Sequence, residues 1–376
     1  MSPRLYIVAG EISGDTHASG LMREVLKQAP AATFTGLGGP LMREVGGAGV
    51  EDWLESAAVL GLVEVLARYS YFKKKMDDCL AAVAKEPPDA VILVDYPGFN
   101  LRLAQAIRDK GIKTRIIYYI SPQVWAWKKG RIKTMAKVLD LMICIFPFEK
   151  PLYEKSGLRT EFAGHPMVDR VQTLRRPFER EPSLVGWFPG SRRNEVKRLF
   201  PVMMQAATLI RRGMPGVRFA VSAANEKLAN EMRAMADAAG MPEAKDWIET
   251  GTVYDLMQRV QCGAVASGTA TLEAACFGLP YALVYQVAWP TYVAAKVVVR
   301  IKFIGMVNVL AGREVVRELV QHLCSPERLA AAMIELLTSA EKREALQREL
   351  AGVVATLGEG GAYERAARAV VGEVAR

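Results

Sequence analysis

Short apolar runs rich in Val and Ile alternate with longer amphipathic stretches along most of this chain of 376 residues. The runs at 5–9, 33–37 and 90–95 have the length and composition of buried strands, and stretches with helical periodicity separate them. Parallel strands need a crossover connection, which is usually a helix. The order therefore predicts an α/β fold built on a parallel sheet.

A second series of the same kind begins after a charged segment with Pro near both ends. This segment, 175–182 (RRPFEREP), is predicted to be the linker, and strands are expected again at 184–188 and 263–267. We therefore expect two Rossmann-like domains, at 1–175 and 183–345, followed by a helical tail at 346–376. Ligands bind at the carboxyl ends of the strands in such sheets, which predicts a site in the cleft between the two domains.

The charge balance favours an anionic partner. Lys and Arg number 49 and Asp and Glu number 40, a net charge of +9. Nucleic acid, anionic lipid and phosphorylated metabolites all fit this charge, but no recognised nucleic-acid-binding module is present, so no nucleic acid is expected. The five cysteines have no CxxC spacing and are predicted to be buried free thiols, and the three histidines lack ligand spacing, so no metal is expected.

The sequence lacks segments typical of secretion, of a membrane span and of dinucleotide or P-loop phosphate binding. The N-terminus has no signal-peptide apolar region, and no window of about 18 unbroken apolar residues exists, so a cytoplasmic chain that is soluble or peripheral to a membrane is expected. The glycines at 10–14 (GEISG) lack GxGxxG spacing and no Walker A sequence occurs. Hydride transfer and P-loop chemistry lose support, and no cofactor is expected.

A predicted phosphate-binding loop lies at 267–273 (SGTATLE), between a strand and a helix. Small residues at Ser267, Gly268 and Thr269 let a phosphate approach the free N–H groups at the helix start. Glu273 lies one turn further on, where a carboxylate could accept hydrogen bonds from two ribose hydroxyls. The alternative is an ordinary capped helix with its capping Glu.

A second loop of this kind follows another strand. It consists of Gly190, Ser191 and Arg192, and the arginine would offer a planar, permanently charged fork to a diphosphate. Taken alone, the loop could be a turn with a surface arginine. Two such loops in one half of the chain predict a nucleotide-diphosphate site.

Asp95 ends a hydrophobic strand, where a carboxylate facing a cleft is a candidate general base. The alternative is a cap for the following helix. The first loop and the segment 121–127 (SPQVWAW) follow other strands, and their polar and aromatic side chains could contact a sugar, a phosphate or a lipid headgroup, or could cap and pack helices. The predicted acceptor-binding residues are Glu11, Ser13, Asp15, Asn100, Gln123 and Trp125.

Two stretches have the composition of membrane-surface segments, with aromatic and apolar residues next to cations. They lie at 59–75 and 289–306. Such faces bind anionic interfaces without spanning them, although either one alone could be a core helix. The predicted membrane-contacting residues are Val65, Leu66, Tyr71, Phe72, Lys73, Trp289, Arg300 and Lys302.

Several motifs together resemble one family. They include 10–15 (GEISGD), 95–100 (DYPGFN), 121–127 (SPQVWAW), 267–273 (SGTATLE) and 308–314 (NVLAGRE), and they occur in family order. On these motifs the chain resembles the lipid-A-disaccharide synthases. The resemblance implies the GT-B fold, in which two Rossmann-like domains face a cleft and the last helix often returns to the first domain.

The resemblance also implies an activity. It is an inverting transfer of 2,3-diacylglucosamine from UDP-2,3-diacylglucosamine to 2,3-diacylglucosamine 1-phosphate, with no bound metal, on the inner face of the inner membrane of Gram-negative bacteria. Asp95 matches the acidic residue that activates the acceptor hydroxyl, Arg192 the diphosphate-binding arginine and Glu273 the ribose-binding residue. Some members form homodimers.

Two positions depart from the family's pattern. Tyr96 stands where many members have Ala, and Gly98 stands where many have a second Asp, so this chain lacks a carboxylate pair at that site. The alternatives are another GT-B enzyme, namely a peptidoglycan glucosaminyltransferase or a UDP-sugar 2-epimerase, and a non-catalytic nucleotide- or lipid-binding protein.

Overall fold

The computed structural model describes residues 2–57, 69–127, 130–289, 292–293 and 302–376. Two compact units divide the chain, the first made of residues 1–166 and 357–376 and the second of residues 167–356. Each is described by itself. The predicted boundaries at 175–182 and 345 differ from these, because helix α10 (Pro166–Leu174) and helix α18 (Ala340–Ala355) fall in the second unit.

The first unit is built on a seven-stranded parallel sheet in the order β3-β2-β1-β4-β5-β6-β7. The doubly wound order places β1 and β4 side by side in the middle, as expected for a Rossmann-like unit. Its strands are β1 (Arg4–Ala9), β2 (Thr33–Gly38), β3 (Val50–Asp52), β4 (Ala90–Val94), β5 (Arg115–Tyr119), β6 (Leu141–Cys144) and β7 (Thr160–Phe162).

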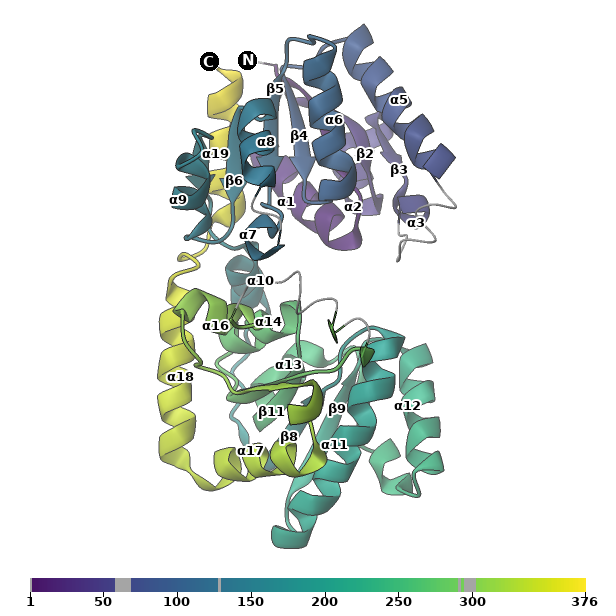
Figure 1. Cartoon of the computed structure of the whole chain (residues 1–376), viewed down its shortest axis with the longest axis vertical. Helices are drawn as coiled ribbons and strands as arrows, with labels where there is room; N and C mark the ends of the chain where they lie inside the picture. The colour runs from purple at the N-terminus through teal and green to yellow at the C-terminus, as the bar shows by residue number, and fades with distance from the viewer. Residues whose placement is uncertain (1, 58–68, 128–129, 290–291, 294–301) are drawn as a thin grey trace. The chain divides into compact units, whose positions relative to one another are not determined.

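Helices cover both faces of this sheet (Figure 1). On one face lie α5 (Tyr69–Lys85), α6 (Pro97–Asp109) and α8 (Arg131–Val138), which share a core with Val91, Leu93 and Tyr118 of the strands. On the other face lie α1 (Ile12–Gln28) and the C-terminal helix α19 (Ala362–Val374). The shorter helices are α2 (Pro40–Gly46), α3 (Leu54–Ala57), α7 (Val124–Trp127) and α9 (Glu149–Glu154).

The C-terminal helix belongs to the first unit although nearly 200 residues separate it from the rest in sequence. The Tyr363 hydroxyl lies 2.9 Å from His17 Nδ1 on α1, and Arg365 donates to the Ala163 carbonyl at 2.8 Å. At the far end, Glu373 is 2 % exposed and forms ion pairs with Arg159 and Arg115. Contacts with the rest of the first unit thus hold α19 at both ends.

The second unit repeats the architecture with a six-stranded parallel sheet in the order β10-β9-β8-β11-β12-β13. Its strands are β8 (Glu181–Phe188), β9 (Arg218–Ala223), β10 (Ile248–Thr250), β11 (Val260–Ala266), β12 (Tyr281–Tyr285) and β13 (Glu318–Val320). Its further helices are α11 (Arg193–Gly213), α12 (Glu226–Ala238), α13 (Val253–Arg259), α14 (Thr269–Cys276), α16 (Met306–Ala311) and α17 (Pro326–Thr338).

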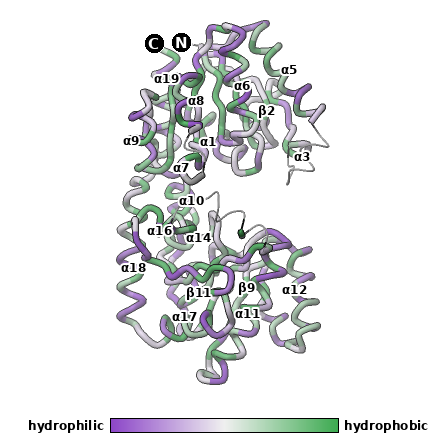
Figure 2. The backbone as a smooth tube through the Cα atoms, in the orientation of Figure 1, coloured by the Kyte–Doolittle hydropathy of each residue, from purple (hydrophilic) through white to green (hydrophobic). Residues whose placement is uncertain are grey.

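Helices α11, α12 and α17 share a hydrophobic core with the strands of this second sheet. Along α18 the backbone tube alternates between hydrophilic and hydrophobic residues (Figure 2), and Leu350 and Val353 are its buried positions. The five cysteines are free and buried, as the sequence predicted. The α/β prediction, with two parallel sheets, is confirmed.

Arg180, in the predicted linker, is fixed to the second unit. Its guanidinium donates to the carbonyls of Met257, Val260 and Phe277 at 2.7–2.9 Å. Strand β8 already begins at Glu181, and Arg175 donates to the Cys276 carbonyl at 2.9 Å. Two arginines of the predicted linker thus bind carbonyls at the ends of neighbouring elements.

Candidate functional site

The loops predicted to carry chemistry in the first unit follow three neighbouring strands. Residues Ala9 of β1 and Val94 of β4 are register partners, and so are Val94 and Tyr119 of β5. Because the carboxyl ends of parallel strands meet at one edge, the segments beginning at 10, 95 and 121 come together there.

Asp95 leaves β4 in an unusual backbone conformation. Its φ is +44° and that of Tyr96 is +49°, so two consecutive non-glycine residues lie in the left-handed region. Gly10 makes room for this turn, since a Cβ there would meet the Tyr96 ring at 2.4 Å. The Tyr96 ring packs edge-on against Trp53, and its hydroxyl donates to the Ala57 carbonyl at 3.2 Å.

The Asp95 carboxyl has the electrostatics of a general base. Burial, with a smaller contribution from the nearby charge of Glu11, raises its pKa from 3.8 to about 6, against a backbone hydrogen bond from Tyr96 that lowers it. A carboxyl group with a pKa near 6 is mostly ionised at neutral pH and remains basic enough to take a proton. The candidate base of the sequence thus has a suitable environment.

The side chain of Asn100 lies behind Asp95 and is fully buried. Its amide donates to the Asp95 carbonyl at 2.7 Å and to the Val94 carbonyl at 3.2 Å. The Tyr118 hydroxyl on β5 donates to the same Asp95 carbonyl. Asn100 was predicted to bind the acceptor, but its side chain is sealed from solvent and holds the turn. Tyr118 was not recognised from the sequence, since it reads as an ordinary core residue of a strand.

The three polar residues of the first loop have different environments. Glu11 and Ser13 are exposed at the start of α1. Asp15 is 2 % exposed, and its carboxylate accepts the backbone N–H groups of Gly39, Leu41 and Met42 at 2.9–3.1 Å. Asp15 therefore caps α2, a role in which a carboxylate satisfies free N–H groups at a helix start. Glu11 and Ser13 are the predicted acceptor-binding residues of this loop that are exposed.

The buried carboxyl group of Glu149 holds Trp125 in place. Trp125 is 7 % exposed, and its indole N–H donates to Glu149 Oε1 at 3.1 Å, while Oε2 of Glu149 accepts the Phe146 N–H at 3.2 Å. Burial raises the pKa of Glu149 to about 7, and the hydrogen bonds from Trp125 and Phe146 oppose the shift. Gln123, between the end of β5 and the start of α7, is exposed. Glu149 was not recognised from the sequence as the partner of Trp125.

The predicted nucleotide loops in the second unit lie side by side. Phe188 at the end of β8 and Val265 near the end of β11 are register partners. The loops that follow line one cavity of about 440 Å³, a size typical of small-molecule sites. All the predicted donor-binding residues line it, namely Gly190, Ser191, Arg192, Ser267, Gly268, Thr269 and Glu273.

The backbone of these loops needs glycine. Gly268 has φ +143° and precedes α14, and Gly190 has φ +100° and lies against Glu195, whose Oε2 would be 2.5 Å from an added Cβ. Both glycines adopt conformations that residues with a side chain rarely take. Arg192 is 70 % exposed and pairs with Glu195 at 3.0 Å, so its guanidinium stands at the rim of the cavity.

Glu273 forms the inner wall of this cavity. It is 9 % exposed and accepts the Tyr254 hydroxyl at 2.9 Å, and the Arg170 guanidinium lies over the Tyr254 ring. Burial raises the pKa of Glu273, opposed by the Tyr254 hydrogen bond and by the charge of Arg170. Tyr254 and Arg170 were not recognised from the sequence, because neither lies within a recognisable motif.

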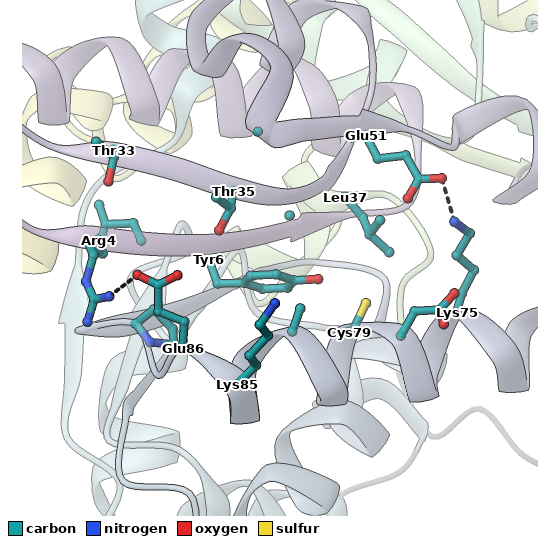
Figure 3. A pocket seen from close by; sticks show the side chains of 16 residues that line it. Arg4, Tyr6, Thr33, Thr35, Leu37, Glu51, Lys75, Cys79, Lys85 and Glu86 are labelled. Atoms are coloured by element: carbon teal, nitrogen blue, oxygen red, sulfur yellow. Dashed lines mark hydrogen bonds and ion pairs between the residues drawn. The ribbon is translucent and has the colours of Figure 1, made fainter.

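A cavity of about 530 Å³ lies elsewhere in the first unit, between α5 and the strands β1 and β2 (Figure 3). Tyr6 lies in the middle of it, and ion pairs join Arg4 to Glu86 and Lys75 to Glu51. It contains none of the predicted site residues. Size alone therefore does not identify the site.

The predicted membrane residues are only partly within the described chain. Val65, Leu66 and Arg300 lie outside the described residues. Tyr71 and Phe72 are half-buried in the aromatic cluster around Trp53, and Lys73 is exposed. Trp289 is 63 % exposed, and Lys302 lies over the Phe303 ring. Among the described residues, no helix has the length and apolar character needed to cross a membrane.

Comparison with solved structures shows the fold. The calicheamicin glycosyltransferase CalG4 superposes with a TM-score of 0.58 at 15% identity, covering 100% of this chain and 99% of that chain. UDP-GlcNAc 2-epimerase from Methanocaldococcus jannaschii, in complex with UDP-GlcNAc and UDP, gives a TM-score of 0.59 at 11% identity and covers 98% and 99%. Two Rossmann-like units of this kind define a protein of the GT-B class.

Sequence comparison narrows this class to one family. The family model described as lipid-A-disaccharide synthetase matches residues 5–370. Lipid-A-disaccharide synthase of Geobacter sulfurreducens is 41% identical over 98% of this chain and 97% of its own length, and that of Trichlorobacter lovleyi is 40% identical over 99% and 97%. The chain belongs to the lipid-A-disaccharide synthase family and is a glycosyltransferase. The resemblance stated from the motifs is confirmed.

Proposed function

We propose that the chain transfers 2,3-diacylglucosamine from UDP-2,3-diacylglucosamine to the 6-hydroxyl of 2,3-diacylglucosamine 1-phosphate. The products are the β-1,6-linked disaccharide 1-phosphate and UDP. The observation that carries the proposal is the family match over residues 5–370. A carboxyl group suited to base catalysis and a nucleotide-sized cavity, both at the carboxyl ends of strands, support it.

UDP binds, in this proposal, to the cavity of the second unit. The diphosphate lies against the backbone N–H groups at the start of α14 and takes a charged hydrogen bond from Arg192. Glu273 accepts the ribose hydroxyls. Its carboxylate is supported for this role by its position in the cavity wall and by the Tyr254 hydroxyl, which fixes one of its oxygens.

The chemistry is a single displacement. Asp95 takes the proton of the acceptor 6-hydroxyl as that oxygen forms a bond to the anomeric carbon of the donor. The bond from this carbon to the UDP oxygen breaks at the same time, and the configuration inverts. The negative charge that develops on UDP is stabilised by Arg192 and by the helix start, so neither a covalent nucleophile nor a second carboxylate is required.

The acceptor headgroup is proposed to contact the exposed residues around Asp95. Glu11, Ser13 and Gln123 are exposed there. Asp15, Asn100 and Trp125 are buried, and they support the site from behind. This division narrows the acceptor-binding set that the sequence predicted.

Peripheral attachment to an anionic membrane is part of the proposal. Both substrates carry acyl chains. The second unit has an exposed aromatic ring at Trp289 and an exposed cation at Lys302, and the first unit has an exposed cation at Lys73. Aromatic and basic groups of this kind bind such interfaces. Attachment at the inner face of the inner membrane and assembly as a homodimer stay predictions.

The experiment that tests the reaction is product formation in detergent micelles from the two proposed substrates, with EDTA present. A disaccharide 1-phosphate that appears together with equimolar UDP, identified by mass spectrometry, supports the proposal. If UDP binds and no disaccharide forms, the proposed substrates are wrong. Replacing the donor by UDP-GlcNAc, or the acceptor by a glucosamine analogue, then identifies which of the two was wrongly assigned.

A further inference from the structure

The carbonyl of Asp95 receives two buried side-chain donors. One is the Asn100 amide, at 2.7 Å from α6, and the other is the Tyr118 hydroxyl from the neighbouring strand β5. Both side chains are 0 % exposed. Since a carbonyl oxygen has two lone pairs, these two donors saturate it. The peptide between Asp95 and Tyr96 is thus held by side chains from two different elements, α6 and β5.

The backbone at this point needs such support. Asp95 and Tyr96 both have positive φ, a conformation that is unfavourable for residues with a Cβ and persists only where surrounding contacts over-determine it. The Asn100 amide also donates to the Val94 carbonyl at 3.2 Å, so one side chain joins the last strand residue to the turn. If these bonds were lost, the turn could relax and move the Asp95 carboxyl.

The orientation of the Asn100 amide is fixed by its neighbours. Its nitrogen faces the carbonyls of Val94 and Asp95, and a flipped amide would place its oxygen against them. Within the described chain its Oδ1 has no hydrogen-bond partner, although it is buried. An unbonded buried oxygen is destabilising, and a residue that keeps one needs a reason other than stability.

We propose that Asn100 and Tyr118 are positioning residues of the transfer reaction, which clamp the Asp95 peptide so that its carboxyl meets the acceptor hydroxyl. The inference rests on the proposed function, because it requires Asp95 to be the base. It assigns Asn100 a role behind the base in place of contact with the acceptor, and it adds a residue that no motif indicated.

Tyr118→Phe tests the clamp because it removes one hydroxyl and little else. We expect kcat to fall about three- to tenfold, the effect of one hydrogen bond, with KM for the UDP-sugar unchanged. The acid limb of the pH profile should also move to lower pH, since a carboxyl that is less firmly held in its buried position is better solvated. If Tyr118→Phe only reduced the fraction of folded enzyme, kcat would fall equally at every pH and the inflection of the pH profile would stay in place.

The matched control is Tyr6→Phe. Tyr6 is a buried tyrosine of β1 in the same sheet, hydrogen-bonded to Cys79 and remote from Asp95, and its variant should keep the wild-type kcat and inflection. Asn100→Ser is the second test variant and should lower kcat at least as much as Tyr118→Phe. Wild-type kcat and inflection in folded Tyr118→Phe or Asn100→Ser would overturn the proposal.

Combining Tyr118→Phe with Asp95→Asn separates the clamp from the proposed function. If the clamp acts through Asp95, Tyr118→Phe has no further effect on the residual turnover of Asp95→Asn. An equal fall in both backgrounds would show that Tyr118 acts elsewhere and overturn the clamp alone. Full turnover in Asp95→Asn itself would remove the base, and with it the clamp as a device of catalysis.

Discussion

Replacing Glu11 by Gln is expected to move the pH dependence of the reaction. A base must be ionised to act, so turnover should fall as the pH drops through the pKa of Asp95, which is about 6. At pH 5 the wild-type enzyme should retain about a tenth of its plateau rate, whereas a carboxyl at the ordinary value of 3.8 would retain about nine-tenths. Glu11→Gln removes the second-largest cause of the shift and leaves burial, so its inflection should lie between these two values.

The assay is kcat/KM for the acceptor from pH 4.5 to 8 at constant ionic strength. The phosphate of the acceptor also titrates near pH 6, but its pKa is the same for both enzymes, so the difference between the two profiles reports on the protein. Glu55→Gln, an exposed glutamate of α3 in the same unit, is the control and should leave the profile unchanged. A wild-type profile that is flat down to pH 5, or an inflection that Glu11→Gln does not lower, would refute the reasoning.

Three further outcomes are expected. Arg192→Ala should weaken UDP binding about 10- to 100-fold, measured by calorimetry. Arg193→Ala is the control and should not weaken it, because the Arg193 side chain pairs with Glu231 outside the cavity. Unchanged affinity in Arg192→Ala would place the diphosphate elsewhere. Glu373→Gln should lower the free energy of unfolding by about 1–3 kcal/mol and reduce Tm, because it breaks the ion pairs that hold α19; an unchanged Tm would contradict this. Trp289→Ser should reduce sedimentation with anionic vesicles, and Phe178→Ser, which also removes an exposed aromatic ring, should not. Equal sedimentation of the two variants with anionic vesicles would contradict a membrane role for Trp289.

The predicted donor-binding residues line one cavity because they lie in two short local loops. Gly190–Arg192 and Ser267–Glu273 each follow a strand directly, and strands β8 and β11 are neighbours, so correct strand ends were enough to bring the loops together. Asp95 and Glu11 also follow neighbouring strands, since β1 and β4 pair in the structure. Parallel-sheet topology turns local motifs into a site at one edge.

What the sequence did not reveal depends on contacts between distant residues. Asp15 reads as a ligand of the first loop, but N–H groups more than 20 residues away occupy its carboxylate. Tyr118 reads as core, and only the left-handed turn at Asp95 shows what its hydroxyl does. Arg180 reads as linker, and carbonyls some 80 residues further on bind it. In each case the partner is backbone, whose position no side-chain pattern encodes.

Asp95→Asn, measured for both turnover and UDP affinity, tests the central claim most directly. The substitution keeps the size of the side chain and removes its basicity. We expect the formation of the disaccharide 1-phosphate to fall by about 10²- to 10⁴-fold, the range for losing a general base, with UDP bound as tightly as by the wild-type enzyme. Turnover within a few-fold of wild type would contradict the assignment of Asp95 as the base on which the mechanism and the clamp both depend.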